Sequence, residues 1–181
     1  DENGNWLYPN EVEKIGEKKF IKKKDNSKVK VGPSESMSKS KKNTIDPETM
    51  ISQYGADSVR WFILSDSPPD KDIQWSANGV EASNKFLQKI WNLNYLISTR
   101  VDKKSDKTKE VELINIINSF AIKIDESINS FRFNVSISYF YQVYKVFKGA
   151  IDSQISNKIF YENIIKIMKL MTPFTPHLSF E

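Results

Sequence analysis

The residues best suited to chemistry lie in one polar segment, from Gly32 to Pro47, in which Met37 is the one apolar side chain between Pro33 and Ile45. The segment carries four serines and three lysines: Ser34, Ser36, Ser38, Ser40, Lys39, Lys41 and Lys42. Serine hydroxyls, exposed backbone N–H groups and mobile lysines bind oxyanions, and a lysine can follow phosphate charge as it moves during a reaction. The segment is therefore either a phosphate-binding arm or a solvated linker, and the residue types alone leave both open.

The net charge of +4 is confined to the N-terminal quarter of the chain. Residues 1–43 hold 11 lysines against 7 acidic residues, whereas residues 44–181 hold 16 basic and 16 acidic residues. A local excess of positive charge attracts the phosphates of a nucleotide or a nucleic acid. The alternative is a lysine-rich ribbon whose charges are simply solvated.

Several function classes are excluded or disfavoured by composition. The chain has no cysteine, which excludes disulfides, thiol catalysis and a cysteine-based zinc site. Its one histidine, His177, gives no basis for a Ser-His-Asp triad, and we expect no metal site. The six glycines form no phosphate-binding loop. No apolar run approaches the ~18 residues of a membrane span, and no signal peptide is visible. We expect a cytoplasmic protein, and a piece of a longer one.

The N-terminal part reads as short strands separated by turn signals. The runs "NWLY", "KKFIKKK" and "KVKV", at residues 5–8, 18–24 and 28–31, are compatible with a small β-ribbon. After the polar segment, Asp46 and Pro47 predict the start of a short helix that Gly55 ends. A second helix is expected over residues 56–64. "KDIQW", at residues 71–75, is expected to be a short strand or an extended segment.

From Ser76 onward the apolar spacing is helical. The first long helix places Val80, Asn84, Leu87, Trp91 and Tyr95 on one stripe, beside Phe86, Ile90, Leu93 and Ile97. After a charged loop at residues 101–109, three more helices follow from spacings of three and four, and prolines 173 and 176 end the last of them. Short connections between long amphipathic helices predict an antiparallel bundle. The predicted fold is mainly α with a small β-ribbon: a β-rich part (1–33), a loop and helix pair (34–75) and a helical bundle (76–181).

The order of these residues resembles a known family. "SMSKSKKN", followed by "IDP", "YGAD.VR" and "SDSPPDKDIQWS", is similar to the class I aminoacyl-tRNA synthetases, in which a KMSKS signature loop precedes such a segment. The double proline and the Trp-Ser pair look most like the leucyl-tRNA synthetases, with the isoleucyl and valyl enzymes as the alternative. "MTPFTPHLS", near residue 175, is also typical of this subgroup.

The resemblance implies roles for the polar segment. Lys39 matches the second signature lysine, which in the family helps to bind ATP and stabilises phosphate charge during amino-acid activation. Met37, Ser38, Ser40 and Lys41 are the other expected contacts to the ATP phosphates, and Mg²⁺ is expected to come with ATP. Ser36 stands where the family has the first signature lysine. Either Lys39 therefore carries a larger share of the phosphate charge, or Lys41 and Lys42 partly compensate.

The resemblance also implies that the bundle is an anticodon-binding domain. Its expected tRNA contacts are Lys85, Lys89, Trp91 and Arg100, against the alternative of a solvated face that covers a buried tryptophan. The expected function is part of a leucine–tRNA ligase, with ATP, leucine, tRNA(Leu) and the remainder of the synthetase chain as partners and no membrane. This segment alone is expected to be inactive. A helical tRNA-binding module without catalytic function is the alternative from another class.

Overall fold

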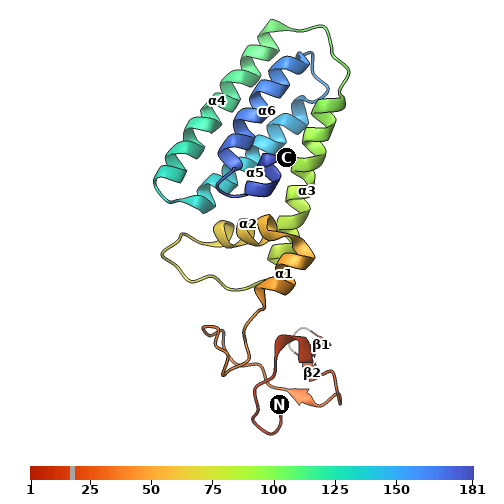
Figure 1. The fold of residues 1–181 in the computed structure, drawn as a ribbon, viewed down its shortest axis with the longest axis vertical. Coiled ribbons are helices and arrows are strands. Elements are labelled where there is room, and N and C mark those ends of the chain that lie inside the picture. The colour runs from red at the N-terminus through yellow and green to blue at the C-terminus, as the bar shows by residue number, and fades with distance from the viewer. Residues whose placement is uncertain (17–18) are drawn as a thin grey trace. The chain divides into compact units, whose positions relative to one another are not determined.

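The computed structural model describes residues 1–16 and 19–181, which fall into two compact units, residues 1–49 and 50–181. The predicted composition of the fold is confirmed: a small antiparallel sheet lies near the N-terminus and helices make up most of the rest (Figure 1). None of the described helices is long and apolar enough to cross a membrane.

The first unit contains the three-stranded sheet. Strands β1 (Val12–Lys14), β2 (Phe20–Lys22) and β3 (Lys28–Val29) pair antiparallel in the order β1-β2-β3, with Glu13 opposite Ile21 and Phe20 opposite Val29. The second and third predicted strands are thus present in shorter form, although Lys18 lies outside the described residues. In the turn between β2 and β3, the Ser27 hydroxyl and N–H donate to Asp25 and lower the pKa of its carboxyl group.

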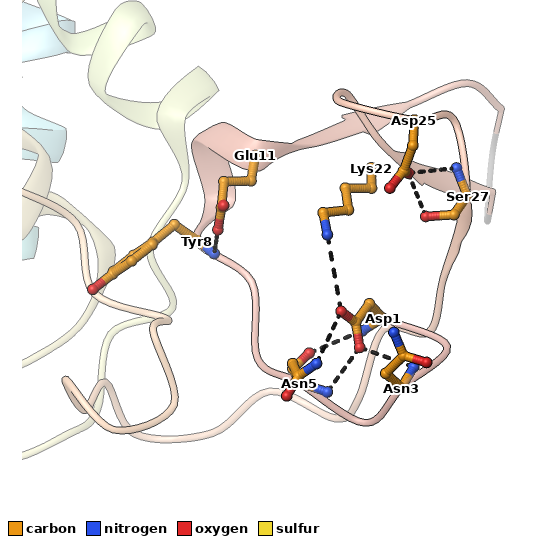
Figure 2. Close-up of polar contacts among 8 residues, drawn as sticks. All are labelled: Asp1, Asn3, Asn5, Tyr8, Glu11, Lys22, Asp25 and Ser27. Carbon is orange, nitrogen blue, oxygen red and sulfur yellow. Dashed lines mark hydrogen bonds and ion pairs between the residues drawn. The ribbon is translucent and has the colours of Figure 1, made fainter.

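The prediction of a strand at residues 5–8 is wrong, and hydrogen bonds to the side chains of Asp1 and Glu11 explain why. The Asn5 N–H donates to the Asp1 carboxylate over 2.8 Å, and the Tyr8 N–H donates to the Glu11 carboxylate over 2.8 Å, as Figure 2 shows. Side chains thereby take up backbone groups that a sheet would need. Residues 5–8 lead instead into a 3₁₀ turn, η1 (Pro9–Glu11), which precedes β1.

Two short helices follow the polar segment: α1 (Pro47–Tyr54) and α2 (Ala56–Asp66). Asp46 caps α1 as predicted, because its carboxylate accepts from the N–H groups of Glu48 and Thr49 over 3.2 and 3.3 Å. The Thr49 hydroxyl, which donates to the same group, lowers the pKa of Asp46. Gly55 separates the two helices with a φ of 81°, a left-handed conformation that favours glycine.

The second unit is built around a helical bundle, as predicted. Its helices are α3 (Ala77–Thr99), α4 (Lys107–Asn129), α5 (Phe133–Ala150), α6 (Asn157–Met171) and the short α7 (Pro176–Phe180). Helices α4 and α6 lie side by side, and α6 also packs against α3 (Figure 1). Ser76 accepts from the Gly79 N–H and caps α3, as its position predicted. Residues 71–75, predicted to be a strand or an extended segment, form no strand.

Aromatic rings fill the end of the core nearest α2. Trp61 is fully buried, and its ring lies 5.4 Å from Phe86, 5.8 Å from Phe140 and 6.2 Å from Phe174, measured between ring centroids. Its indole N–H donates to the Tyr141 hydroxyl over 3.3 Å. This one side chain therefore joins α2 to α3, to α5 and to the residues that precede α7.

The prediction that Val80, Asn84, Leu87, Trp91 and Tyr95 share one stripe on α3 fails at its last two residues. Val80 and Leu87 are buried, but Trp91 is 52% exposed and Tyr95 is 64% exposed. Steps of four residues advance about 40° past a full turn, because an α-helix has 3.6 residues per turn. Two such steps after Leu87 carry the stripe away from the core. The neighbouring stripe, predicted through Phe86, Ile90, Leu93 and Ile97 in steps of four and three, is confirmed as buried, with Ser83 and Leu87 beside it.

Candidate functional site

The polar segment forms a closed turn rather than an open arm. Residues 39–42 make the turn, in which the Lys42 N–H donates to the Lys39 carbonyl oxygen over 3.2 Å. Lys42 has a φ of 50°, which is uncommon for a residue other than glycine. Backbone of this kind persists when its surroundings hold it in place.

Asn43 holds the two limbs of this turn together. Its side-chain oxygen accepts from the Ser38 N–H over 2.7 Å, and its side-chain nitrogen donates to the Ser36 carbonyl oxygen over 3.2 Å. On the incoming limb, the Ser38 hydroxyl accepts from the Lys41 N–H over 3.3 Å and lies 3.3 Å from the Ser40 hydroxyl. The segment is thus closed by its own side chains.

The three lysines of the segment have different surroundings. The Lys41 ammonium pairs with the Glu35 carboxylate, and the Lys42 ammonium lies over the Tyr8 ring, 5.2 Å from its centroid. The Lys39 side chain is exposed, and its ammonium has no polar or ring partner among the residues that the structure describes. Lys39 is therefore the lysine of this turn that is available to an anion without first losing a partner.

The other predicted loop residues lie around the same turn. Met37 precedes it and is 48% exposed, Ser38 is half-buried, and Ser40 is exposed at the second position of the turn. The five residues predicted to contact the ATP phosphates are consecutive in the chain, and all of them lie in this turn or directly before it. Sequence reasoning did not single out Glu35, Tyr8 or Asn43. Only Asn43 carried a signal, since asparagine side chains commonly bond to nearby backbone in turns.

The residues predicted to contact tRNA do not form one cluster. Lys89 lines a groove of about 390 Å³ between α3 and α5, together with Asn92 and Tyr95 from α3 and Tyr144 and Lys148 from α5. No acidic residue lines this groove, and α5 contains none along its length. The groove is therefore a place where two lysines from different helices converge, and Lys148 was not foreseen.

Lys85 and Trp91 lie outside that groove. Lys85 forms an ion pair with Glu81, one turn earlier on α3, and both side chains are largely exposed. Trp91 lines a different groove, of about 470 Å³, with Tyr161, Ile165 and Phe180 among its other lining residues. The alternative interpretation of a buried tryptophan on this face is wrong, because Trp91 is half exposed.

Arg100 is engaged inside the bundle. Its guanidinium donates to the carbonyl oxygens of Ile151, Ser153 and Ile155 over 2.6 to 2.7 Å, and to the Asn157 side chain over 2.7 Å. It also lies 4.5 Å from the centroid of the Phe160 ring. One arginine thereby holds the connection between α5 and α6 through four hydrogen bonds.

Glu110 fastens the same connection from α4. Its carboxylate accepts from the Ser156 N–H over 3.1 Å and from the Lys107 ammonium over 3.4 Å, and its side chain is only 6% exposed. Hydrogen bonds from the Ser156 side chain and backbone lower the pKa of Glu110 from 4.5 to about 2. The carboxylate therefore stays charged, and stabilises this connection, at pH values well above 2.

His177 lies where α7 contacts α2. Its Nδ1 atom lies 2.9 Å from the Asp57 carboxylate, which also accepts from the Leu178 N–H over 2.7 Å at the start of α7. Asp57 thereby caps α7 and joins it to α2. Among residues 1–16 and 19–181, no three histidine, aspartate or glutamate side chains lie close enough to hold a metal ion.

Comparison with known families matches both parts of the chain. Residues 18–76 match the family described as tRNA synthetases class I (I, L, M and V), and residues 110–181 match the anticodon-binding domain of tRNA ligase. The polar turn lies in the first match, and α4 to α7 lie in the second.

Relatives and a solved structure agree with these matches. Leucine–tRNA ligases of Rickettsia africae and Rickettsia prowazekii are 41% and 40% identical over 184 and 188 residues, covering the whole of this chain. The chain spans only 22% of the length of either relative. The ternary complex of a LeuRS from Agrobacterium radiobacter with tRNA and LeuAMS has a similar fold, with a TM-score of 0.68 and 23% identity over 79% of this chain and 20% of that one.

Proposed function

We propose that this chain, which matches class I aminoacyl-tRNA synthetases over residues 18–76 and is homologous to part of leucine–tRNA ligases, supplies the signature loop and the tRNA-contacting helices of a leucine–tRNA ligase. Residues 34–75 end the catalytic part in this proposal, and residues 76–181 form the anticodon-binding bundle. The observation that carries the proposal is the closed turn that leaves the Lys39 ammonium exposed and without a partner in the part of the chain that the structure describes.

The proposed reaction explains why a lysine is needed there. The leucine carboxylate attacks the α-phosphate of ATP, and leucyl-adenylate and pyrophosphate are formed. Negative charge builds up on the pentavalent phosphorus centre and on the leaving pyrophosphate. Lys39 stabilises this charge more strongly in the transition state than in the ground state, and only such a difference accelerates the chemical step. A hydroxyl of the terminal ribose of tRNA(Leu) then attacks the carbonyl carbon of leucyl-adenylate, and AMP leaves as the ester to tRNA forms.

ATP is held at this turn mainly through its phosphates. Serine hydroxyls at Ser38 and Ser40 and the backbone at Met37 lie beside Lys39, while Lys41 has to exchange Glu35 for phosphate before it can contribute. We expect Mg²⁺ to arrive with ATP, because this ion keeps several waters and is commonly bound through substrate phosphates. These protein groups bind and orient the phosphates, and cleavage of ATP supplies the free energy that drives formation of leucyl-adenylate.

The experiment for this proposal measures ATP–pyrophosphate exchange by the full-length enzyme, with leucine, isoleucine or valine as the amino acid. We expect exchange that depends on leucine. Lys39→Ala lowers its rate about a hundredfold, the typical cost of removing one group that stabilises transition-state charge. Lys23→Ala, at another exposed lysine of the same unit, is the matched control and leaves the rate unchanged. Exchange driven equally by isoleucine or valine would contradict the assignment to leucine.

The bundle is proposed to meet tRNA through the α3–α5 groove. Lys89 and Lys148 supply two positive charges to a groove whose lining contains no acid, and Tyr95 and Asn92 add groups that bond to phosphate or sugar. Lys85 lies one turn from Lys89 and is available once its exposed pair with Glu81 opens, which costs little. Trp91 remains proposed as a separate stacking contact. Arg100 remains a proposed contact only in a form that would give up its bonds to the α5–α6 connection.

The isolated chain is proposed to be inactive in leucylation. It spans only 22% of the length of the relatives that it matches. Charging of tRNA with labelled leucine by the purified chain would contradict this. Salt-sensitive tRNA binding by the same chain, without charging, agrees with the proposal.

A further inference from the structure

Asn43 is the residue that closes the polar turn from the outgoing limb. Its amide oxygen accepts from the Ser38 N–H over 2.7 Å, and its amide nitrogen donates to the Ser36 carbonyl oxygen over 3.2 Å. The two bonds reach backbone groups that flank Met37, immediately before the turn that begins at Lys39. A single side chain thus carries a donor and an acceptor to the same stretch of backbone.

These bonds fix the backbone that presents Lys39. An open polar segment of this length would have to be ordered when ATP binds, at about 1 to 2 kcal/mol of backbone entropy per residue. A turn that is closed beforehand avoids part of this cost. The turn also contains Lys42 in a left-handed conformation, at a φ of 50°, which needs support from its surroundings.

The bonds of Asn43 do not depend on the side chain at position 36. Asn43 bonds to the carbonyl oxygen of Ser36, so the turn closes equally well with serine where the family has its first signature lysine. With that lysine absent, and with Lys41 beside Glu35 and Lys42 over Tyr8, the placement of Lys39 matters more.

We propose that Asn43 is a positioning residue for amino-acid activation, which acts by holding the Ser36–Ser38 backbone so that Lys39 is aimed at the ATP phosphates. Asn43 does not touch ATP in this account. The inference rests on the function proposed above, and it adds a residue that neither the signature nor the charge pattern indicates.

The test is a double-mutant cycle on ATP–pyrophosphate exchange by the full-length synthetase. Asn43→Ala lowers kcat about tenfold, corresponding to about 1.4 kcal/mol. The KM for leucine and the midpoint of chemical unfolding stay the same, because the turn buries no side chain. In the Lys39→Ala background, Asn43→Ala lowers kcat less than about twofold further, because a residue that acts through Lys39 has nothing left to position.

Asn10→Ala is the matched control, since Asn10 is an exposed asparagine of the same unit and its side-chain amide forms no hydrogen bond with residues 1–16 or 19–181. It leaves both exchange and unfolding unchanged. An unchanged kcat in Asn43→Ala, or equal losses with and without Lys39, would overturn the positioning role while the proposed function stands. An unchanged rate in Lys39→Ala would instead overturn the proposed function.

Discussion

The two units of this chain differ in the interactions that stabilise them. Residues 1–49 include the lysine-rich stretch 1–43, with a net charge of +4, and contain no buried side chain among those that the structure describes. Residues 50–181 contain the buried hydrophobic core from Trp61 to Phe174. Polar contacts near water are individually weak, and segments that depend on them open at low cost. A packed core is far less tolerant of change. The chain thus separates the part proposed to react from the part that keeps its shape.

This difference predicts where substitutions will affect stability and where they will affect activity. Changes in the core of the bundle are expected to lower the free energy of unfolding. Changes in the polar turn are expected to leave it nearly the same and to alter the proposed reaction. The following four predictions test that division, beginning with the largest effect.

Trp61→Ala is expected to destabilise the 181-residue chain by about 3 to 5 kcal/mol, the usual cost of removing a buried large aromatic side chain. Trp61 is fully buried and packs against Phe86, Phe140 and Phe174. Chemical denaturation followed by circular dichroism measures the change. Trp91→Ala is the control, because Trp91 is 52% exposed and its loss should cost far less. Equal losses at the two tryptophans would contradict the packing described here.

Arg100→Ala is expected to lower the free energy of unfolding by about 2 kcal/mol, because hydrogen bonds from a charged donor contribute about 1.5 to 3 kcal/mol. The three carbonyl oxygens and the Asn157 side chain lose their donor. Arg100→Lys keeps the charge but not the planar fork of donors, so most of the loss should persist. Denaturation of both variants measures this. Weaker tRNA binding with unchanged stability would show that Arg100 serves tRNA instead.

Glu110→Gln is expected to remove part of the acid sensitivity of the bundle. The pKa of Glu110 is lowered from 4.5 to about 2, so its carboxylate contributes stability that is fully present above pH 4.5 and is lost as pH falls towards 2. The wild-type chain should therefore be more stable than the variant at pH 7, and the two should converge near pH 2. Unfolding midpoints at a series of pH values measure this. A constant difference across the range would contradict the assignment.

Lys89→Ala and Lys148→Ala should have the smallest effect, and it should appear only in tRNA binding. Each lysine that meets a phosphate contributes roughly 0.9 to the slope of log affinity against log salt concentration for a duplex. Each substitution should make the slope shallower by about that amount, and the two together by about twice as much. Lys158→Ala on α6, an exposed lysine away from the α3–α5 groove, is the control. Identical slopes in all variants would place the tRNA contact elsewhere.

The sequence predicted the local features of this molecule well. Asp46 and Ser76 were recognised as caps because capping depends on residues three positions apart at most. The long helices were recognised because their apolar spacing repeats over several turns. The polar segment was located from its composition, and its match to a signature gave the most specific prediction, Lys39.

The features that sequence reasoning missed depend on contacts across the chain. The resemblance placed Arg100 among the expected tRNA contacts, but the sequence did not indicate the acceptors of its guanidinium, which lie more than 50 residues further along. Lys148 joins Lys89 only because α3 and α5 pack together. Residues 5–8 have the composition of a strand, but side chains at Asp1 and Glu11 take their N–H groups. The periodicity of apolar residues along the sequence gives no information about which distant residues will be partners.

The sequence left two alternatives open around Ser36, and the surroundings of the three lysines favour one of them. Lys41 and Lys42 were possible substitutes for the missing signature lysine. Lys41 is paired with Glu35 and Lys42 lies over Tyr8, so both have partners to lose, whereas Lys39 has none among the described residues. The geometry therefore favours Lys39 as the main carrier of phosphate charge.

The most direct test of the division between the two units measures exchange and unfolding on the same preparation of the full-length Lys39→Ala enzyme. The account predicts that leucine-dependent ATP–pyrophosphate exchange falls about a hundredfold, while the midpoint of chemical unfolding stays that of the unaltered protein. Exchange at the original rate, or a loss of exchange that is matched by a lower unfolding midpoint, would contradict it.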